Sequence, residues 1–319
     1  MTEPASSRYR VGLLGARGHV GVELLGLVLA HPALEVAYLG SRQLAGKTLE
    51  SQLPAAQGKG LVFEDLAPEA VAQRPVDLVF LALPNGLAAP YVEALRGAVP
   101  DCRLVDLSAD HRFHDDWIYG LPEHHRARIR GARAVANPGC YATAAQVALR
   151  PIASELALAP SIFGVSGYSG AGTTPSPKND VALLRDNLMP YALAGHLHER
   201  EIGHQLGRSV RFMPHVAPFF RGITLTIDCE LREATTAGAL EARYRAVYAG
   251  ETLIEIMSEP PLVRDAAGRH GVTVGGFTVS GTRAVVVATI DNLLKGAATQ
   301  ALQNANLALG LPELAGIQG

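Results

Sequence analysis

The sequence predicts an α/β protein with two domains, and three observations support this fold class. The chain has 319 residues, which is longer than one ordinary hydrophobic core requires. Short apolar runs alternate with helix-forming stretches up to about residue 140, as in a parallel sheet covered by helices. After residue 210 strand signals dominate, and every second residue of 223–231 is apolar. We therefore expect a parallel-sheet domain and an α+β domain with a mostly antiparallel sheet.

Composition excludes several classes of protein. The net charge of −2 gives no sign of a nucleic-acid or membrane-surface partner. The chain has no run of 18 apolar residues, and residues 1–10 are polar and lack the apolar segment of a signal peptide. The three cysteines are widely spaced and odd in number, which argues against a disulfide framework. A reduced, cytoplasmic protein is the expected class.

The first strand leads into a glycine motif that is typical of dinucleotide binding. A strand over 10–15 is followed by a glycine-rich turn, a helix and a second strand over 34–39. Gly15 permits the tight turn, Gly18 lets a pyrophosphate approach the backbone, and Gly21 lets the helix pack close to the strand. A purely structural glycine turn is the alternative. We predict a Rossmann-type domain.

The end of the second strand indicates which dinucleotide is bound. NAD sites usually carry an acidic residue there for the ribose hydroxyls, but Glu35 is at the start of this strand. Ser41 and Arg42 stand at its end, and a hydroxyl with a guanidinium suits a 2′-phosphate. The sequence therefore predicts NADP(H), unless Arg42 is only a solvated loop residue. The turn Pro84-Asn85-Gly86, after a third strand, lies where the nucleotide would cross the strand ends.

Cys140 is the candidate nucleophile. It follows Asn137-Pro138-Gly139 at a strand–turn–helix junction, so it is expected near a helix N-terminus. The partial positive charge there would stabilise a thiolate, and the free N–H groups could hold an oxyanion. The alternative is a buried structural cysteine, which is the interpretation that suits Cys102 and Cys229 in their strands.

Later segments supply candidate histidines and a final helix. A helix is expected from Glu199, directly after His196-Leu197-His198, and another from Asp291, as N-cap, to about Leu309. His-x-His alone is more often a surface or metal feature than a catalytic one. A zinc site is not expected because the chain has no Cys-x-x-Cys.

At this point the residues resemble a known family. Ten motifs occur in the family's order: 15–21, 41–42, 82–86, 106–112, 119–123, 137–141, 169–172, 196–202, 214–223 and 291–297. The chain resembles the N-acetyl-γ-glutamyl-phosphate reductases of arginine biosynthesis, within the aspartate-semialdehyde dehydrogenase superfamily. Asn137-Pro138-Gly139-Cys140-Tyr141 is the most specific motif. Two departures are Leu197, where the family usually has Arg, and a longer loop over 173–180.

The resemblance implies a fold and a reaction. An NADP-binding domain over 1–140 would be completed by the C-terminal helix, 291–319, and 141–290 would form the catalytic, substrate and oligomerisation domain. The reaction would be NADPH-dependent reduction of a small-molecule acyl phosphate to an aldehyde through a cysteine thioester, in a homodimer or homotetramer. The alternatives are another acyl phosphate, as in aspartate-semialdehyde dehydrogenase or a carrier-protein-linked aminoadipyl or glutamyl phosphate reductase, and a non-catalytic dinucleotide sensor.

The resemblance also implies roles for individual residues. Cys140 would be the nucleophile and His196 the acid/base, with His198 as the fallback and no metal ion. The expected substrate contacts are Arg112, Arg221, Tyr191 and His198, unless the two arginines are ordinary ion-pair residues. The expected cofactor contacts are Gly15, Arg17, Gly18, His19, Val20, Gly21, Ser41, Arg42, Pro84, Ser169, Gly170 and Asn292.

Overall fold

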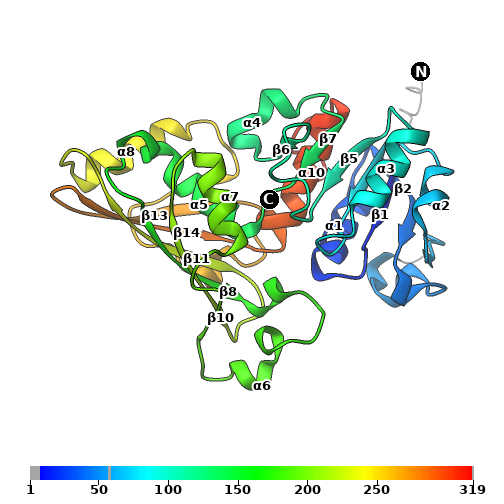
Figure 1. Cartoon of the computed structure of the whole chain (residues 1–319), viewed down its shortest axis with the longest axis horizontal. Helices are drawn as coiled ribbons and strands as arrows, with labels where there is room; N and C mark the ends of the chain where they lie inside the picture. The colour runs from blue at the N-terminus through cyan, green and yellow to red at the C-terminus, as the bar shows by residue number, and fades with distance from the viewer. Residues whose placement is uncertain (1–7, 57–58, 318–319) are drawn as a thin grey trace. The chain divides into compact units, whose positions relative to one another are not determined.

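The computed structural model describes residues 8–56 and 59–317, and it contains two compact units (Figure 1). The first unit comprises the chain up to Pro138 together with the residues from Ala297 onward, and the second comprises Gly139–Gly296. The sequence placed these boundaries at 140/141 and 290/291, so Cys140 and 291–296 fall in the second unit. Residues 1–7, part of the polar segment considered for a signal peptide, lie outside the described residues.

The first unit is built on a parallel sheet, as predicted. Its order is β3-β2-β1-β4-β5-β7-β6, and all neighbouring strands are parallel. The strands are β1 (Tyr9–Leu14), β2 (Leu34–Gly40), β3 (Phe63–Glu64), β4 (Leu78–Leu81), β5 (Arg103–Asp106), β6 (Ile118–Tyr119) and β7 (Ala134–Ala136). The strand order reverses between β1 and β4. In open α/β sheets, a dinucleotide binds outside the carboxyl ends of the strands at such a point.

Helices cover both faces of this sheet. Side chains alternate along β4, so that Leu78 and Phe80 join one core while Val79 and Leu81 join another. The first core contains α1 (His19–Ala30) and α10 (Thr299–Leu309), and the second contains α2 (Pro68–Ala72) and α3 (Ala89–Ala98). The helix α4 (Pro122–Ile129) packs against α10, all eleven residues of which are buried.

The C-terminal segment differs from the single helix expected over 291–309. The carboxylate of Asp291 accepts hydrogen bonds from the N–H groups of Leu293 and Leu294, at 2.8 and 3.0 Å. A π-helical turn, Leu294–Ala298, follows, and α10 begins only at Thr299. The N–H of Gly296 reaches back five residues to the carbonyl of Asp291, which is the bond that widens this turn.

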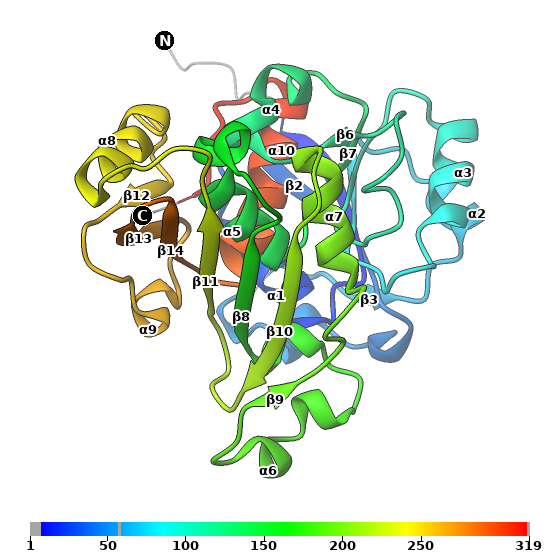
Figure 2. The same cartoon turned by 60° about the vertical axis from the view of Figure 1, so that its left-hand side comes forward.

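The second unit contains a mixed, mostly antiparallel sheet, also as predicted. Its order is β12-β13-β14-β11-β8-β10-β9, with parallel pairing only for β8–β10 and β12–β13 among the described strands. The strands are β8 (Ser161–Gly167), β9 (Met189–Pro190), β10 (Arg211–Ala217), β11 (Ile223–Glu230), β12 (Ile254–Ile256), β13 (Val272–Ser280) and β14 (Arg283–Ile290). Figure 2 shows β8, β10 and β11 running side by side.

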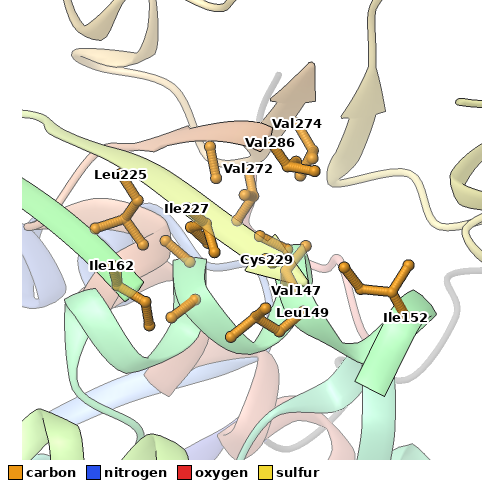
Figure 3. Close-up of a cluster of buried hydrophobic side chains, with 14 of the residues drawn as sticks. Val147, Leu149, Ile152, Ile162, Leu225, Ile227, Cys229, Val272, Val274 and Val286 are labelled. Atoms are coloured by element: carbon orange, nitrogen blue, oxygen red, sulfur yellow. The ribbon is translucent and has the colours of Figure 1, made fainter. Parts of the chain in front are cut away.

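Helices cover one face of this second sheet. Val147 and Leu149 of α5 (Cys140–Leu149) pack over Leu225 and Ile227 of β11, in the core that also buries Cys229 (Figure 3). The core also receives residues of α7 (Leu197–Leu206) and α8 (Ala237–Val247), and the short helices α6 (Val181–Leu184) and α9 (Val263–Ala266) complete the unit. On β8, Phe163 does not join this core and remains 39% exposed. In the part of the chain that the structure describes, no helix has both the length and the apolar character needed to span a membrane.

Candidate active site

Cys140 is the first residue of α5, as the sequence predicted. Gly139 is the N-cap with extended backbone and has no side chain of its own to cap the helix, and the first turn has no acidic residue. Cys140 is only half-buried, whereas burial raises the pKa of Cys102 and of Cys229 to about 12. Of the three thiols, Cys140 alone therefore combines access with the positive end of a helix.

The backbone of Gly296 lies against Cys140. A Cβ atom placed on Gly296 would lie 2.7 Å from the Cβ of Cys140 and 3.0 Å from the carbonyl oxygen of Asp291. No real Cβ fits at such distances, so only glycine allows the π-helical turn to approach the cysteine this closely. No residue near Gly296 in the sequence indicates this contact, because Cys140 is far away in the chain.

Four rings lie around the nucleophile. Tyr191 and His196 have ring centroids 5.5 Å apart, His196 and His198 are 5.0 Å apart, and His198 is 5.7 Å from Tyr141, the residue after Cys140. Burial raises the pKa of Tyr191 well above its usual value, and the nearby charge of the Cys140 thiolate adds to this shift. The structure thus brings Tyr191, His196 and His198 into the surroundings of Cys140.

The hydrogen bonding of His196 fixes the position of its proton. His196 is the N-cap of α7, and its Nδ1 accepts a hydrogen bond from the backbone N–H of His198 at 3.1 Å. Nδ1 is therefore unprotonated, and the neutral ring carries its proton on Nε2. Burial, and then the charge of Lys178, lower the pKa of His196, so the neutral form is favoured.

Glu201 lies in the 196–202 motif, but the sequence alone does not indicate its role. It is fully buried, and its Oε1 accepts the backbone N–H of Gly139 at 2.9 Å. Its Oε2 lies 4.0 Å from Nε2 of His198, one turn earlier on α7. The three-residue spacing between His198 and Glu201 was the one signal available, since such residues share a helix face.

A second cluster surrounds Asp291. Nε of Arg221 lies 2.9 Å from the buried Asp291 carboxylate, which holds the guanidinium in place. The amide of Asn292 accepts the N–H of Gly222 at 2.7 Å and donates to Oγ of Ser169 at 2.9 Å. Asn292, expected as a cofactor contact, therefore uses both ends of its amide to join two loops of the second unit. Gly170 lies beside these residues, where a Cβ would come within 2.9 Å of Oγ of Ser166.

The glycine motif of the first unit has the geometry that a pyrophosphate requires. Gly15 has φ of +83°, and its Cβ would lie 2.1 Å from the carbonyl oxygen of Ala82. A Cβ on Gly21 would lie 2.5 Å from the carbonyl oxygen of Gly15, so the helix packs tightly there. Gly18 is the N-cap of α1, without a capping side chain or an acidic residue in the first turn. This helix end consists of Gly18, His19 and Val20, and Arg17 precedes it. Its backbone N–H groups therefore suit an anion.

Ser41 and Arg42 directly follow β2, at the carboxyl edge of the sheet. Arg42 is 87% exposed in its side chain, and its Nε lies 3.8 Å from the exposed carboxylate of Asp65. Such a pair is weak, so the guanidinium can turn to a phosphate. Pro84 is exposed in the turn after β4, and the next residue, Asn85, accepts the N–H of Ala109 at 3.0 Å.

Arg112 belongs to the first unit and is 8% exposed. Its guanidinium donates to the carbonyl oxygens of Asn137 and Leu107, at 3.0 and 3.1 Å. Just before it, His111 lies 2.5 Å from the buried carboxylate of Asp106 and stacks on Trp117. These contacts fix the segment that carries Arg112.

Comparisons with known proteins agree with this fold. Two family models match the chain: "Semialdehyde dehydrogenase, NAD binding domain" at residues 10–132, and "Semialdehyde dehydrogenase, dimerisation domain" at residues 140–292. Aspartate semialdehyde dehydrogenase II from Vibrio cholerae, solved with ASA, superposes with a TM-score of 0.76 at 21% identity, over 96% of this chain and 99% of that one. The corresponding enzyme of Candida albicans, solved with NADP, gives a TM-score of 0.75 at 20% identity, over 94% and 98%. The two-unit fold and the two family models thus define a protein of the semialdehyde dehydrogenase class.

Sequence relatives narrow the class. N-acetyl-gamma-glutamyl-phosphate reductase of Stenotrophomonas maltophilia is 58% identical over 313 residues, which cover 98% of both chains. The protein of that name from Xanthomonas campestris pv. campestris (strain B100) is 56% identical over 96% of this chain and 98% of its own, and the one from Xylella fastidiosa is 54% identical over 98% and 94%. The chain belongs to the N-acetyl-gamma-glutamyl-phosphate reductase family.

Proposed function

We propose that the protein reduces N-acetyl-L-glutamyl 5-phosphate to N-acetyl-L-glutamate 5-semialdehyde with NADPH and releases phosphate, a step of arginine biosynthesis. The observation that carries this proposal is Cys140, accessible at the start of α5 and surrounded by Tyr191 and two histidines. The names of the relatives at 54–58% identity support the substrate. No feature of the described residues favours a carrier-linked substrate or a non-catalytic sensor.

Cys140 performs the first step. The thiol first loses its proton to solvent; the thiolate Sγ then bonds to the acyl carbon, the bond from that carbon to the phosphate oxygen breaks, and phosphate leaves with the electron pair. The N-terminal N–H groups of α5 stabilise the thiolate that attacks. After reduction of the thioester, the carbon–sulfur bond breaks, the aldehyde leaves, and the thiolate takes a proton from solvent.

His196 acts as a hydrogen-bond donor through Nε2. Its Nδ1 is occupied by the N–H of His198, and its low pKa keeps the ring neutral, so Nε2 carries a proton that can point at a negative oxygen. Such a donor stabilises the oxyanion that forms on attack and on reduction. The acid/base role expected from the sequence stays a prediction; in the neutral form, Nε2 donates a hydrogen bond and accepts no proton. His198 beside Glu201 is the candidate for proton transfer.

The cofactor proposed is NADP(H), which supplies the hydride when bound. The turn from Gly15 to Gly21 would hold the pyrophosphate at the N-terminus of α1, and Ser41 and Arg42 would hold the 2′-phosphate. The absence of an acidic residue at the end of β2 supports NADP over NAD. The NADP in the Candida albicans relative agrees with this assignment.

Arginines are the proposed contacts for the substrate's anionic groups. Arg221, fixed by Asp291, and Arg112, fixed by backbone carbonyls, supply positive charge for a carboxylate or a phosphate. Leu197 supplies no such charge, so the contact made by Arg in most of the family is absent here.

We further propose that the second unit forms a homodimer. The name of the matching family model supports this, and so does the exposed Phe163 on the sheet face away from the helices. The three free cysteines are consistent with a reducing compartment such as the cytoplasm.

The test is phosphate-dependent reduction of NADP⁺ by N-acetylglutamate 5-semialdehyde, with Cys140→Ser measured in parallel. We expect activity in the parent and a loss of at least about 10³-fold in the variant. Iodoacetamide near neutral pH should alkylate Cys140 first, and substrate should block this reaction. Activity that survived in Cys140→Ser would refute the thioester mechanism, and an inactive parent with an unreactive Cys140 would support a sensor.

A further inference from the structure

The first unit contains an open pocket of about 640 Å³ that the proposed reaction does not use. Its lining includes Cys102 just before β5, Ile118 at the start of β6 and Ala134 at the start of β7, and these elements can be followed in Figure 1. The pocket therefore lies at the amino edge of the parallel strands. The dinucleotide crevice lies at the opposite, carboxyl edge of the same sheet. The two sites are separate within one unit.

The rim of this pocket is strongly basic. Four arginines line it, Arg96, Arg128, Arg130 and Arg133, against a single carboxylate, Asp116. This local excess of positive charge occurs in a chain whose net charge is −2. A concave surface lined by one sign of charge concentrates ions of the opposite sign.

Ion pairs within the protein neutralise only part of the positive charge of these arginines. Arg96 pairs with Asp116 at 2.9 Å, and Arg133 donates to Asp101 at 2.9 Å. Among the residues that the structure describes, Arg128 and Arg130 lie near no carboxylate at ion-pair distance, and both are exposed. The C-terminus of α4 favours a positively charged residue in its last turn, which accounts for an arginine at position 128. The partial negative charge of the helix end does not neutralise the full charge of this arginine.

The floor of the pocket is apolar. Cys102, Leu104 and Ala134 are buried there, and Ile118 is half-buried. Cys102 acts as a small hydrophobe in this floor, because burial raises its pKa to about 12. A volume of several hundred Å³ with an apolar floor and a few convergent polar groups matches the usual form of a small-molecule site.

We infer that this pocket binds a small organic anion with at least two negative charges, carried on carboxylate or phosphate groups, and an apolar body. Arg128 and Arg130 provide the guanidinium donors for the anionic groups, and the floor formed by Leu104, Ile118 and Ala134 receives the body. The residues that line it are distinct from those proposed for the cofactor and cysteine sites. An acidic peptide is the less suitable occupant, because the floor of the pocket is concave and apolar.

Isothermal titration of the full-length protein tests the inference. The protein is first saturated with NADP⁺, and phenyl phosphate, phthalate and neutral phenol are then titrated at low ionic strength. We expect one saturable site for a dianion, a tenfold or greater loss of affinity in Arg128→Gln/Arg130→Gln, and no binding of phenol. The two dianions show whether phosphate or carboxylate is preferred. The control, Arg211→Gln/Arg232→Gln, removes two exposed arginines of the second unit and should bind like the parent.

A second measurement locates the site without any substitution. Phenylglyoxal modifies accessible arginines, and mass spectrometry of the peptides identifies which ones react. Phenyl phosphate should protect Arg128 and Arg130 but leave Arg211 reactive. Two outcomes would overturn the inference. One is equal affinity of the parent and of Arg128→Gln/Arg130→Gln for the dianions. The other is no saturable binding together with no protection of Arg128 and Arg130 from phenylglyoxal.

Discussion

The buried carboxylate of Glu201 accepts a hydrogen bond from the backbone N–H of Gly139 at 2.9 Å, directly before Cys140, the proposed nucleophile. This bond ties α7, which carries His198, to the turn that begins α5. The bond therefore holds Cys140 and the histidines at the start of α7, His196 and His198, in fixed positions relative to each other. The carboxylate thus acts on the position of the reacting groups and not on the substrate itself.

Replacement of Glu201 tests this positioning role. Glu201→Ala leaves a buried N–H without its acceptor, so we expect a loss of about 1–3 kcal/mol in the free energy of unfolding and a fall in kcat. Glu201→Gln retains an oxygen that can accept the bond, so its loss of stability should be smaller. Denaturant titration and steady-state kinetics measure both effects, with the exposed Glu259→Ala as control. An unchanged kcat in Glu201→Ala would disprove the role.

Gly296→Ala should disturb the nucleophile without touching its chemistry. The added Cβ would lie 2.7 Å from the Cβ of Cys140, so one of the two segments has to move. We expect a destabilisation of about 1–3 kcal/mol and reduced alkylation and turnover at Cys140. Gly26→Ala, in the middle of α1 with no atom within 4 Å of the new Cβ, is the matched control and should stabilise the protein by about 0.5–1 kcal/mol. Full activity in Gly296→Ala would mean that the close approach has no function.

Arg42→Ala should change the cofactor preference. Removal of the guanidinium takes away a charge-assisted contact with the 2′-phosphate, so the KM for NADP⁺ should rise about tenfold or more. NAD⁺ has no such phosphate, and its KM serves as the internal control because it should stay constant. An equal change in the KM for NADP⁺ and the KM for NAD⁺ would mean that Arg42 does not contact the 2′-phosphate specifically.

His196 should make the stability depend on pH. Burial lowers its pKa from 6.5, so below about this pH the unfolded chain binds more protons than the folded one. The free energy of unfolding should therefore fall as the pH is lowered from 6.5 through the folded-state pKa. Urea titrations at several pH values should show a smaller fall in His196→Gln, while His204→Gln, exposed on the same helix, should behave like the parent. An identical pH dependence in His196→Gln and the parent would refute this assignment.

Local patterns were sufficient to predict the sheets and the position of Cys140. The glycines at 15, 18 and 21 and the alternation over 223–231 are properties of neighbouring residues, and these segments fold as predicted. Glu201 and Gly296 were not assigned because their contacts are with residues far away in the chain. The π-helical turn was also missed, because it depends on the bond from Gly296 to Asp291 and on no local composition.

The course of the chain has a consequence for biosynthesis. The ribosome makes the whole of Gly139–Gly296 before it reaches α10, yet α10 belongs to the core of the first unit and is buried along its full length. The nascent N-terminal sheet therefore has one apolar face only partly covered, by α1 without α10, while the second unit, whose residues are contiguous, is already able to fold. During that interval the uncovered face is a natural binding site for chaperones, and translation speed through the second unit sets how long it lasts.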